Sequence, residues 1–105
     1  MARKFTLVAS PTFKAKVMIP VAGSQPAPIE FIFKHRDTDV FKEWMDNLKG
    51  STDDVELIKD IASGWDLDDP FDDENILMLT QNYMGSARAV VEKYIAENTG
   101  AKLGN

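Results

Sequence analysis

The sequence contains no cysteine and a single histidine, His35. Without cysteine the chain can form no disulfide, and it has neither a thiolate nucleophile nor the sulfur ligands of a structural zinc site. One histidine cannot supply the paired imidazoles of a zinc helix, and no serine lies in the glycine-flanked turn that presents a catalytic serine. We therefore expect no metal site, no cofactor and no enzymatic activity.

Long apolar runs are also missing. The opening run from Phe5 to Ala9 is followed closely by Pro11, and the other apolar runs are equally short. Such runs are too short for a signal peptide or a membrane-spanning helix. We therefore expect a cytoplasmic protein with no membrane partner.

Charge is distributed unevenly along the chain, whose net charge is -5. Residues 1–36 carry six basic side chains and one acidic one, a net +5, whereas the rest carries six basic and sixteen acidic ones, a net -10. Most of the chain would repel phosphate, so we expect no nucleic-acid partner. Opposite charge favours attraction between the two parts in the fold, and it also suggests head-to-tail association of copies.

Two stretches of alternating polar and apolar residues predict a β-hairpin over residues 13–34. The first stretch runs from Phe13 to Ile19 and the second from Ile29 to Lys34, with a loop rich in glycine and proline between them. A two-stranded hairpin is only marginally stable by itself. It must therefore pack on the remainder of the chain, and His35 then lies at the hairpin end.

Residues 38–98 show helical periodicity and predict three to four helices. The first follows a cap at Asp37 or Thr38 and ends before Gly50. The second follows the capping sequence Ser51–Asp54 and extends to Gly64. The apolar positions of these two helices are Phe41, Trp44, Met45 and Leu48, then Val55, Ile58, Ile61 and Ala62.

The longest helical pattern runs from Asp72 to about Asn98, with Gly85 inside it. A glycine within a helix costs about 1 kcal/mol relative to alanine, so Gly85 either kinks this helix or divides it in two. We predict a single α+β domain over residues 1–105 that is mostly helical, with a flexible tail over residues 99–105.

An acidic segment precedes this last pattern and contains Asp66, Asp68, Asp69, Asp72, Asp73 and Glu74. Its start resembles a calcium-binding loop, but Pro70 replaces a ligand, Phe71 replaces the glycine of the sharp turn, and Leu77 replaces the bidentate glutamate. Capping of a helix N-terminus accounts for about half of these acids without any metal.

Large apolar side chains are the remaining candidates for function. Trp44 and Tyr83 fall at helical spacing, and we expect them in the core. Trp65 and Phe71 instead flank the acidic break and belong to no periodic stripe, so we predict a partner-binding surface there. Its predicted residues are Trp65, Leu67, Asp68, Asp69 and Phe71.

Three segments of the chain resemble the tail assembly chaperones of long-tailed phages and prophages. These are Lys4–Val17, the string Ser63–Phe71 that reads SGWDLDDPF, and Gln81–Tyr83 leading into Ala87–Ala89. The resemblance extends over nearly the whole chain. It adds no functional residue to those predicted from physical reasoning.

The resemblance implies a protein that binds the phage tape measure protein, keeps it soluble and helps bring tail tube protein to it. It further implies a place in the cytoplasm of the host bacterium, absence from the mature virion, and a longer frameshifted form of the same protein as an additional partner. Two alternatives remain at this point. One is a small phage protein that binds a host target through its acidic surface, and the other is a structural component of the tail.

Overall fold

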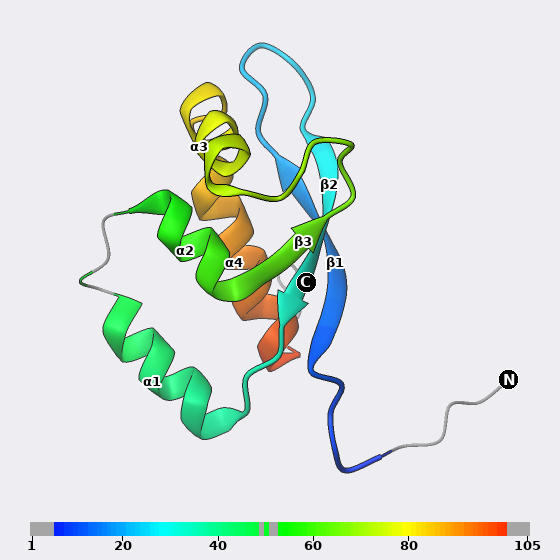
Figure 1. Cartoon of the computed structure of the whole chain (residues 1–105), viewed down its shortest axis with the longest axis vertical. Coiled ribbons are helices and arrows are strands. Elements are labelled where there is room, and N and C mark those ends of the chain that lie inside the picture. Colours follow the sequence, from blue (N-terminus) through cyan, green and yellow to red (C-terminus); the bar gives the residue numbers. More distant parts are fainter. Residues whose placement is uncertain (1–5, 49, 51–52, 101–105) are drawn as a thin grey trace, which may run out of the picture.

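The computed structural model describes residues 6–48, 50 and 53–100. In chain order, its elements are β1 (Thr12–Ile19), β2 (Ala27–Lys34), α1 (Thr38–Leu48), α2 (Asp54–Ile61), β3 (Ala62–Trp65), α3 (Asp73–Asn82) and α4 (Ser86–Thr99), shown in Figure 1. The three strands form one antiparallel sheet in the order β1-β2-β3. The fold is therefore α+β, and the helices hold less than half of the described residues, so the prediction of a mostly helical chain is wrong.

The hairpin is confirmed, and its pairing runs without interruption from Thr12 opposite Lys34 to Ile19 opposite Ala27. Alternate side chains of both strands are buried, because one face of the sheet is covered by helices and the other faces water. The connection projects beyond the helices (Figure 1). Gly23 turns it with a φ of 75°, a conformation that other residues rarely adopt.

A third strand, β3, replaces the end of the predicted second helix. α2 stops at Ile61, and Ala62 is extended, with φ -132° and ψ 151°. β3 pairs with the second edge of β2 and contains an irregularity opposite Ile32 and Phe33. Pairing with β3 gives hydrogen-bond partners to main-chain groups of β2 that would otherwise lack them. These hydrogen bonds stabilise the extended segment more than the helical periodicity of its sequence would stabilise a helix.

Gly64 allows β3 to approach the sheet closely. A Cβ atom built at this position would lie 3.2 Å from Cδ1 of Ile32, closer than such atoms usually pack. Gly64, which the sequence suggested as the end of a helix, therefore lies in a strand and permits its close packing.

The first helix forms as predicted and packs on the core through Phe41, Trp44, Met45 and Leu48. Trp44 is 7% exposed, which confirms its predicted place in the core, and its ring meets that of Tyr94 edge to face at 5.2 Å. The ring centre of Phe41 lies 6.3 Å from that of the same tyrosine. Asp37 caps the helix by accepting a hydrogen bond from the Val40 amide at 3.0 Å, so the first of the two proposed caps is the one used.

The long C-terminal pattern is divided into α3 and α4, and the division occurs next to Gly85. A Cβ atom at Gly85 would lie 3.0 Å from Cγ of Pro20, so the joint between the helices packs on the end of β1. The division also changes the environment of Tyr83, which follows the end of α3 and is 39% exposed. Its predicted burial in the core is wrong, because the helical period on which it relied ends there.

The C-terminal helix continues through Thr99, whose hydroxyl donates to the carbonyl of Ile95 at 2.8 Å, and Gly100 ends it with a φ of 75°. The first two residues of the predicted flexible tail are thus the last residue of α4 and its cap, and residues 101–105 lie outside the described residues. Ser51 and Thr52 of the proposed capping sequence also lie outside them, and Asp53 caps α2 by accepting from the amides of Val55 and Glu56. Among the described parts of the chain, no helix has the length and apolar character needed to cross a membrane.

Candidate partner-binding groove

The loop between β3 and α3 is held to the sheet by Trp65. The ring of Trp65 meets Phe31 of the buried sheet face at 6.0 Å and Phe71 at 5.1 Å, both edge to face. Its indole Nε1 donates a hydrogen bond of 2.7 Å to the carbonyl of Asp69. The loop therefore folds back over Trp65 and gives the surface at this end of the sheet a fixed shape.

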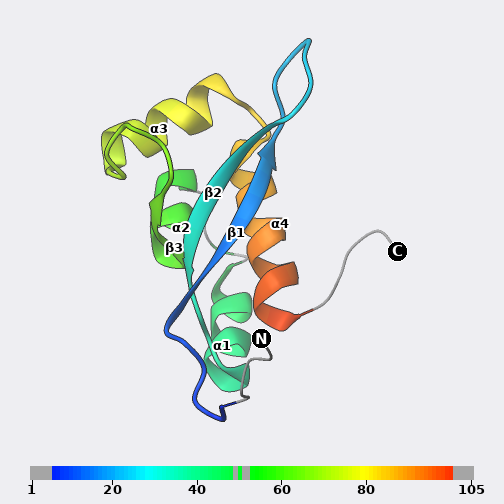
Figure 2. The same ribbon diagram turned by 90° about the vertical axis from the view of Figure 1, so that its right-hand side faces the viewer.

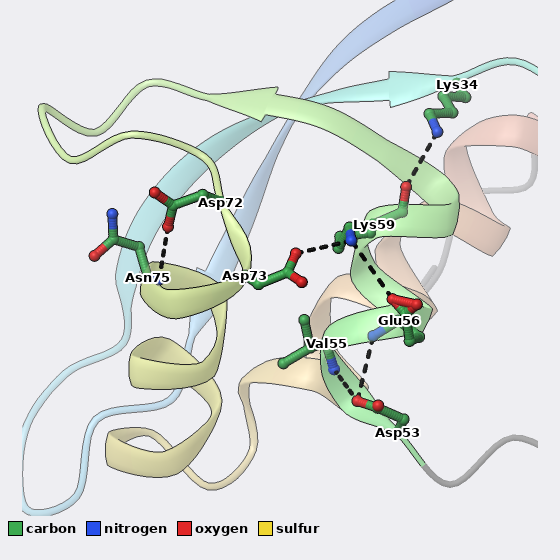
Figure 3. Close-up of polar contacts among 8 residues, drawn as sticks. All are labelled: Lys34, Asp53, Val55, Glu56, Lys59, Asp72, Asp73 and Asn75. Carbon is green, nitrogen blue, oxygen red and sulfur yellow. Dashed lines mark hydrogen bonds and ion pairs between the residues drawn. The ribbon is translucent and has the colours of Figure 1, made fainter.

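Three of the six acids in this segment have structural roles. The amide of Asp66 donates to the carbonyl of Glu30, and a carboxylate oxygen of Asp66 accepts from the Glu30 amide, both at 3.0 Å. Asp72 caps α3 by accepting from the amide of Asn75 at 2.9 Å, and Asp73 forms a 2.8 Å ion pair with Lys59 of α2 (Figure 3). The expectation that capping explains part of the cluster is confirmed at Asp72.

The ion pair between Asp73 and Lys59 joins the start of α3 to the end of α2. The pKa of Lys59 is raised mainly because its side chain forms a hydrogen bond to Asp73. The neighbouring carboxylate of Glu56 raises this pKa further (Figure 3). Lys34 reaches the same place from β2 and donates to the carbonyl of Lys59 at 3.1 Å. The acidic segment is therefore anchored to both the sheet and α2.

An apolar groove of about 460 Å³ opens between the loop end of the hairpin, the segment after β3 and α3. Three large apolar side chains stand partly exposed at it: Leu67 (38%), Met78 (50%) and Tyr83 (39%). We call this surface the apolar groove, and it is lined by Ile19, Val21, Ala27, Pro28, Ile29, Trp65, Leu67, Asp69, Asn75, Met78, Leu79, Asn82 and Tyr83.

The rigidity of the apolar groove comes from its polar contacts. Asn75, in the first turn of α3, donates from its side chain to the carbonyl of Pro70 at 2.8 Å. With the bond from Trp65 to Asp69, it holds the middle of the acidic loop at two adjacent carbonyls, one bonded from each side of the loop. An apolar surface that is pre-formed in this way loses little conformational entropy when a partner binds.

Of the five residues predicted for partner binding, Trp65, Leu67 and Asp69 line the apolar groove. Phe71 is half-buried against Trp65 and does not line it, and Asp68 is exposed nearby. The structure thus brings three of the predicted residues together, and Phe71 packs against one of them, Trp65.

Sequence reasoning missed Met78 and Tyr83, which α3 places at the apolar groove. Ile76 to Leu79 is an uninterrupted apolar run, so a short helix containing it cannot bury all four side chains on one face. That run was the available signal for Met78. The contributions of Val21 and Pro28 had no such signal, because they depend on where the hairpin connection lies relative to α3.

Within the described ranges, no three side chains of histidine, aspartate or glutamate are grouped so that they could hold a metal ion. His35 follows β2, is exposed, and donates its backbone amide to the carbonyl of Pro11 at 2.9 Å. What the apolar groove offers is therefore an apolar contact surface with a carboxylate and two amide side chains at its margin.

The comparison with known families agrees with the resemblance seen in the three sequence segments. The model of a family described as phage tail assembly chaperone matches residues 1–105. No curated protein and no solved structure shows a significant match to the chain. Because the family match spans the whole sequence, the chain belongs to the phage tail assembly chaperones.

Proposed function

We propose that this tail assembly chaperone binds the tape measure protein of its phage at the apolar groove, by covering an apolar stripe on an amphipathic helix of that partner. The observation that carries the proposal is the gathering of Leu67, Met78 and Tyr83 at one pre-formed groove. Soluble proteins seldom leave contiguous large apolar side chains exposed unless a partner covers them. An amphipathic helix presents side chains at a spacing that such a groove can accept.

The acids around the apolar groove support a role in keeping a partner soluble. Asp69 lies at the groove, and Asp68 is exposed beside it without a salt bridge among the described residues. When the apolar side chains are covered, these carboxylates remain at the rim and keep the complex negatively charged. They also favour partner helices that carry lysine or arginine next to the apolar stripe.

The size of the apolar groove implies weak binding at each site. Burying one leucine-sized side chain contributes about 1.5–3 kcal/mol, while association costs at least about 4 kcal/mol. One helix segment would therefore be held loosely, and many copies along a long partner would cover it collectively. A chaperone of this kind can be displaced when tail tube protein arrives.

Several further properties belong to the same proposal. The chaperone would act in the cytoplasm of the host bacterium and leave before the virion is complete. Tail tube protein and a longer frameshifted form of the chain would be its other partners, and copies would associate along the tape measure protein. The acidic surface that would suit a host target is partly committed to the fold through Asp66, Asp72 and Asp73.

A co-purification experiment with matched variants tests the proposal. The tagged chaperone is expressed with the adjacent tail genes, captured, and the retained proteins are identified by mass spectrometry. Met78→Ser removes an apolar side chain from the groove, whereas Leu77→Ser removes its neighbour, which is 45% exposed and does not line the groove. We expect Met78→Ser to lose most of the tape measure protein and Leu77→Ser to retain it.

Two results would count against the proposal. Equal recovery of tape measure protein with both variants would show that the apolar groove does not bind it. Recovery of a basic host protein in place of any tail protein, with a steep loss at higher salt, would favour the acidic surface as the binding site.

A further inference from the structure

Strand β1 is an edge of the sheet, and its outward main-chain groups can be identified from the register. The amide of His35 donates to the carbonyl of Pro11 at 2.9 Å, which makes the adjacent pair Thr12 and Lys34 a non-hydrogen-bonded pair of the antiparallel ladder. The alternation then places Phe13, whose partner is Phe33, in a hydrogen-bonded pair. The amides and carbonyls of the even-numbered residues of β1 therefore point away from β2.

The pairing on the other side of β2 supports this assignment. The carbonyl of Glu30 accepts from the amide of Asp66, and the amide of Glu30 donates to the Asp66 carboxylate, so the main-chain groups of Glu30 point toward β3. Lys16 lies opposite Glu30 and consequently turns its own amide and carbonyl to the free edge. Figure 2 views the protein from the side on which β1 lies, and among the described elements no strand pairs with its outer edge.

The exposed edge is long and regular enough to accept another strand. β1 has eight residues, none of them proline, and its pairing with β2 contains no bulge. Natural sheets usually protect such edges by shortening them, bending them or covering them. Within the sequence of β1, the protective feature is a pair of lysines, Lys14 and Lys16, which stand exposed on the open face of the sheet.

These lysines determine which segment can pair with the edge. Neither forms a salt bridge among the described residues, and on β2 only Lys16 has an acid, Glu30, opposite it, whereas Lys14 faces Ile32. If two copies paired β1 with β1 in antiparallel fashion, lysine would face lysine near the centre of the contact, which is unfavourable. An added strand with acidic side chains opposite these positions would instead form cross-strand ion pairs.

We infer that the free edge of β1 is a second binding surface, which takes an extended, acid-bearing segment of a partner protein as a fourth strand. Main-chain hydrogen bonds supply affinity in this mode, and side chains at alternate positions supply specificity. The segment needs acids two residues apart to meet Lys14 and Lys16, and an apolar residue beyond them to contact Met18, which is 53% exposed. This inference does not depend on the apolar groove, whose lining includes none of Lys14, Lys16 and Met18.

The test uses a blocked eight-residue peptide in which valine and glutamate alternate, except that valine replaces the glutamate that would lie opposite Met18, added to the whole chaperone labelled with ¹⁵N. We expect saturable amide shifts at Lys14, Lys16 and Met18, and slower hydrogen exchange of these amides. A matched peptide with lysine in place of glutamate should bind at least about tenfold more weakly, because it places like charges across the pair.

A proline variant tests whether main-chain pairing is responsible. The amide of Lys16 points outward, so Lys16→Pro removes an edge donor while leaving the β1–β2 ladder intact, which the remaining ladder amides will report. Lys16→Thr is its control, because it removes the charge and keeps the donor. We expect Lys16→Pro to weaken peptide binding at least about tenfold and Lys16→Thr to weaken it by a smaller factor.

A second probe keeps the test valid if Lys16→Pro does not fold. The same valine–glutamate peptide, N-methylated at alternate residues so that it cannot donate to β1, should fail to bind the unchanged chaperone. Equal binding of the methylated and unmethylated peptides would overturn the inference. So would amide shifts confined to the apolar groove, or a complete absence of shifts at millimolar peptide.

Discussion

Nη1 of Arg36 donates a hydrogen bond of 2.9 Å to the hydroxyl of Tyr94, a residue 58 positions further along the chain. The same guanidinium donates to the carbonyl of Asp60 at 3.0 Å and lies 3.2 Å from its carboxylate. The hydroxyl of Tyr94 in turn donates to the carbonyl of Lys34 at 2.8 Å. One cation therefore joins the end of the hairpin to α2 and α4.

Replacing this cation should destabilise the whole fold. The side chain of Arg36 is 14% exposed, so Arg36→Ala leaves partly buried acceptors without their donor, and we expect a loss of about 2–3 kcal/mol in the free energy of unfolding. Urea denaturation measures it. Arg88→Ala is the control, because its ion pair with Glu92 is exposed and should contribute less than about 0.5 kcal/mol. Equal losses in the two variants would contradict this role for Arg36.

The environment of Tyr94 predicts a change at alkaline pH. Burial raises the pKa of Tyr94 above its ordinary value of 10.0, and the hydrogen bond from Arg36 opposes this rise only in part. The native state therefore holds the phenolic proton more tightly than the unfolded state. This contribution to stability is complete below the unfolded pKa of about 10 and is lost as the pH rises through the higher native value.

Absorbance of tyrosinate at alkaline pH measures this shift directly. In a Tyr83→Phe background, Tyr94 is the one remaining tyrosine, so the titration reports a single group. We expect the native protein to titrate above the same protein unfolded in urea. A native midpoint at or below that of the unfolded protein would contradict the burial argument. The raised pKa of Lys59 adds to the stability loss in the same pH window but gives no absorbance signal.

Both the hairpin and the helical stripes could be predicted from the sequence, because each rests on a local period that tertiary packing preserves. The strand β3 could not. Ala62 continues a helical stripe, and only the unpaired edge of β2 explains why the backbone becomes extended there. The predicted burial of Tyr83 was wrong for a related reason. α3 ends beside Tyr83, and Gly85 packs on Pro20, a residue far away in sequence.

Capping of α3 by Asp72 should be separable from the charge of the acidic segment. Asp72→Ala removes the oxygen that accepts from the Asn75 amide, and we expect a loss of about 1 kcal/mol in unfolding free energy. Asp72→Asn keeps an acceptor and should lose much less. Asp68→Ala removes a charge of the same sign without a cap, so it should leave stability almost unchanged. A loss in Asp68→Ala as large as that in Asp72→Ala would show that charge, and not capping, is responsible.

Trp65 should contribute far more to stability than its neighbour at the groove. Trp65→Ala removes ring contacts with Phe31 and Phe71 and the bond to Asp69, and we expect a loss of about 3 kcal/mol. Leu67→Ala, at a more exposed position, should cost less than about 1 kcal/mol. Thermal or urea unfolding of both variants provides the comparison. A Trp65→Ala protein as stable as the unchanged one would show that the loop is not anchored by this ring.

The candidate site was only partly predictable from the sequence. Trp65 stood out because it flanks the acidic break and belongs to no periodic stripe, Leu67 was predicted along with it, and both line the apolar groove. Phe71 stood out because it also flanks the acidic break, but its ring packs against Trp65 and does not line the groove. This position depends on the path of the loop. The opposite wall, with Val21 and Pro28, is built by the hairpin connection and has no mark in the local sequence.

Photo-crosslinking can show whether the tape measure protein lies at the apolar groove. A photoreactive phenylalanine analogue is placed at Met78 or, as the matched control, at Leu77, and each protein is irradiated while it is expressed with the adjacent tail genes. We expect position 78 to crosslink to helical segments of the tape measure protein and position 77 to do so weakly. Efficient crosslinking from position 77 but not from position 78 would contradict this expectation, because the partner would then lie on another face of α3.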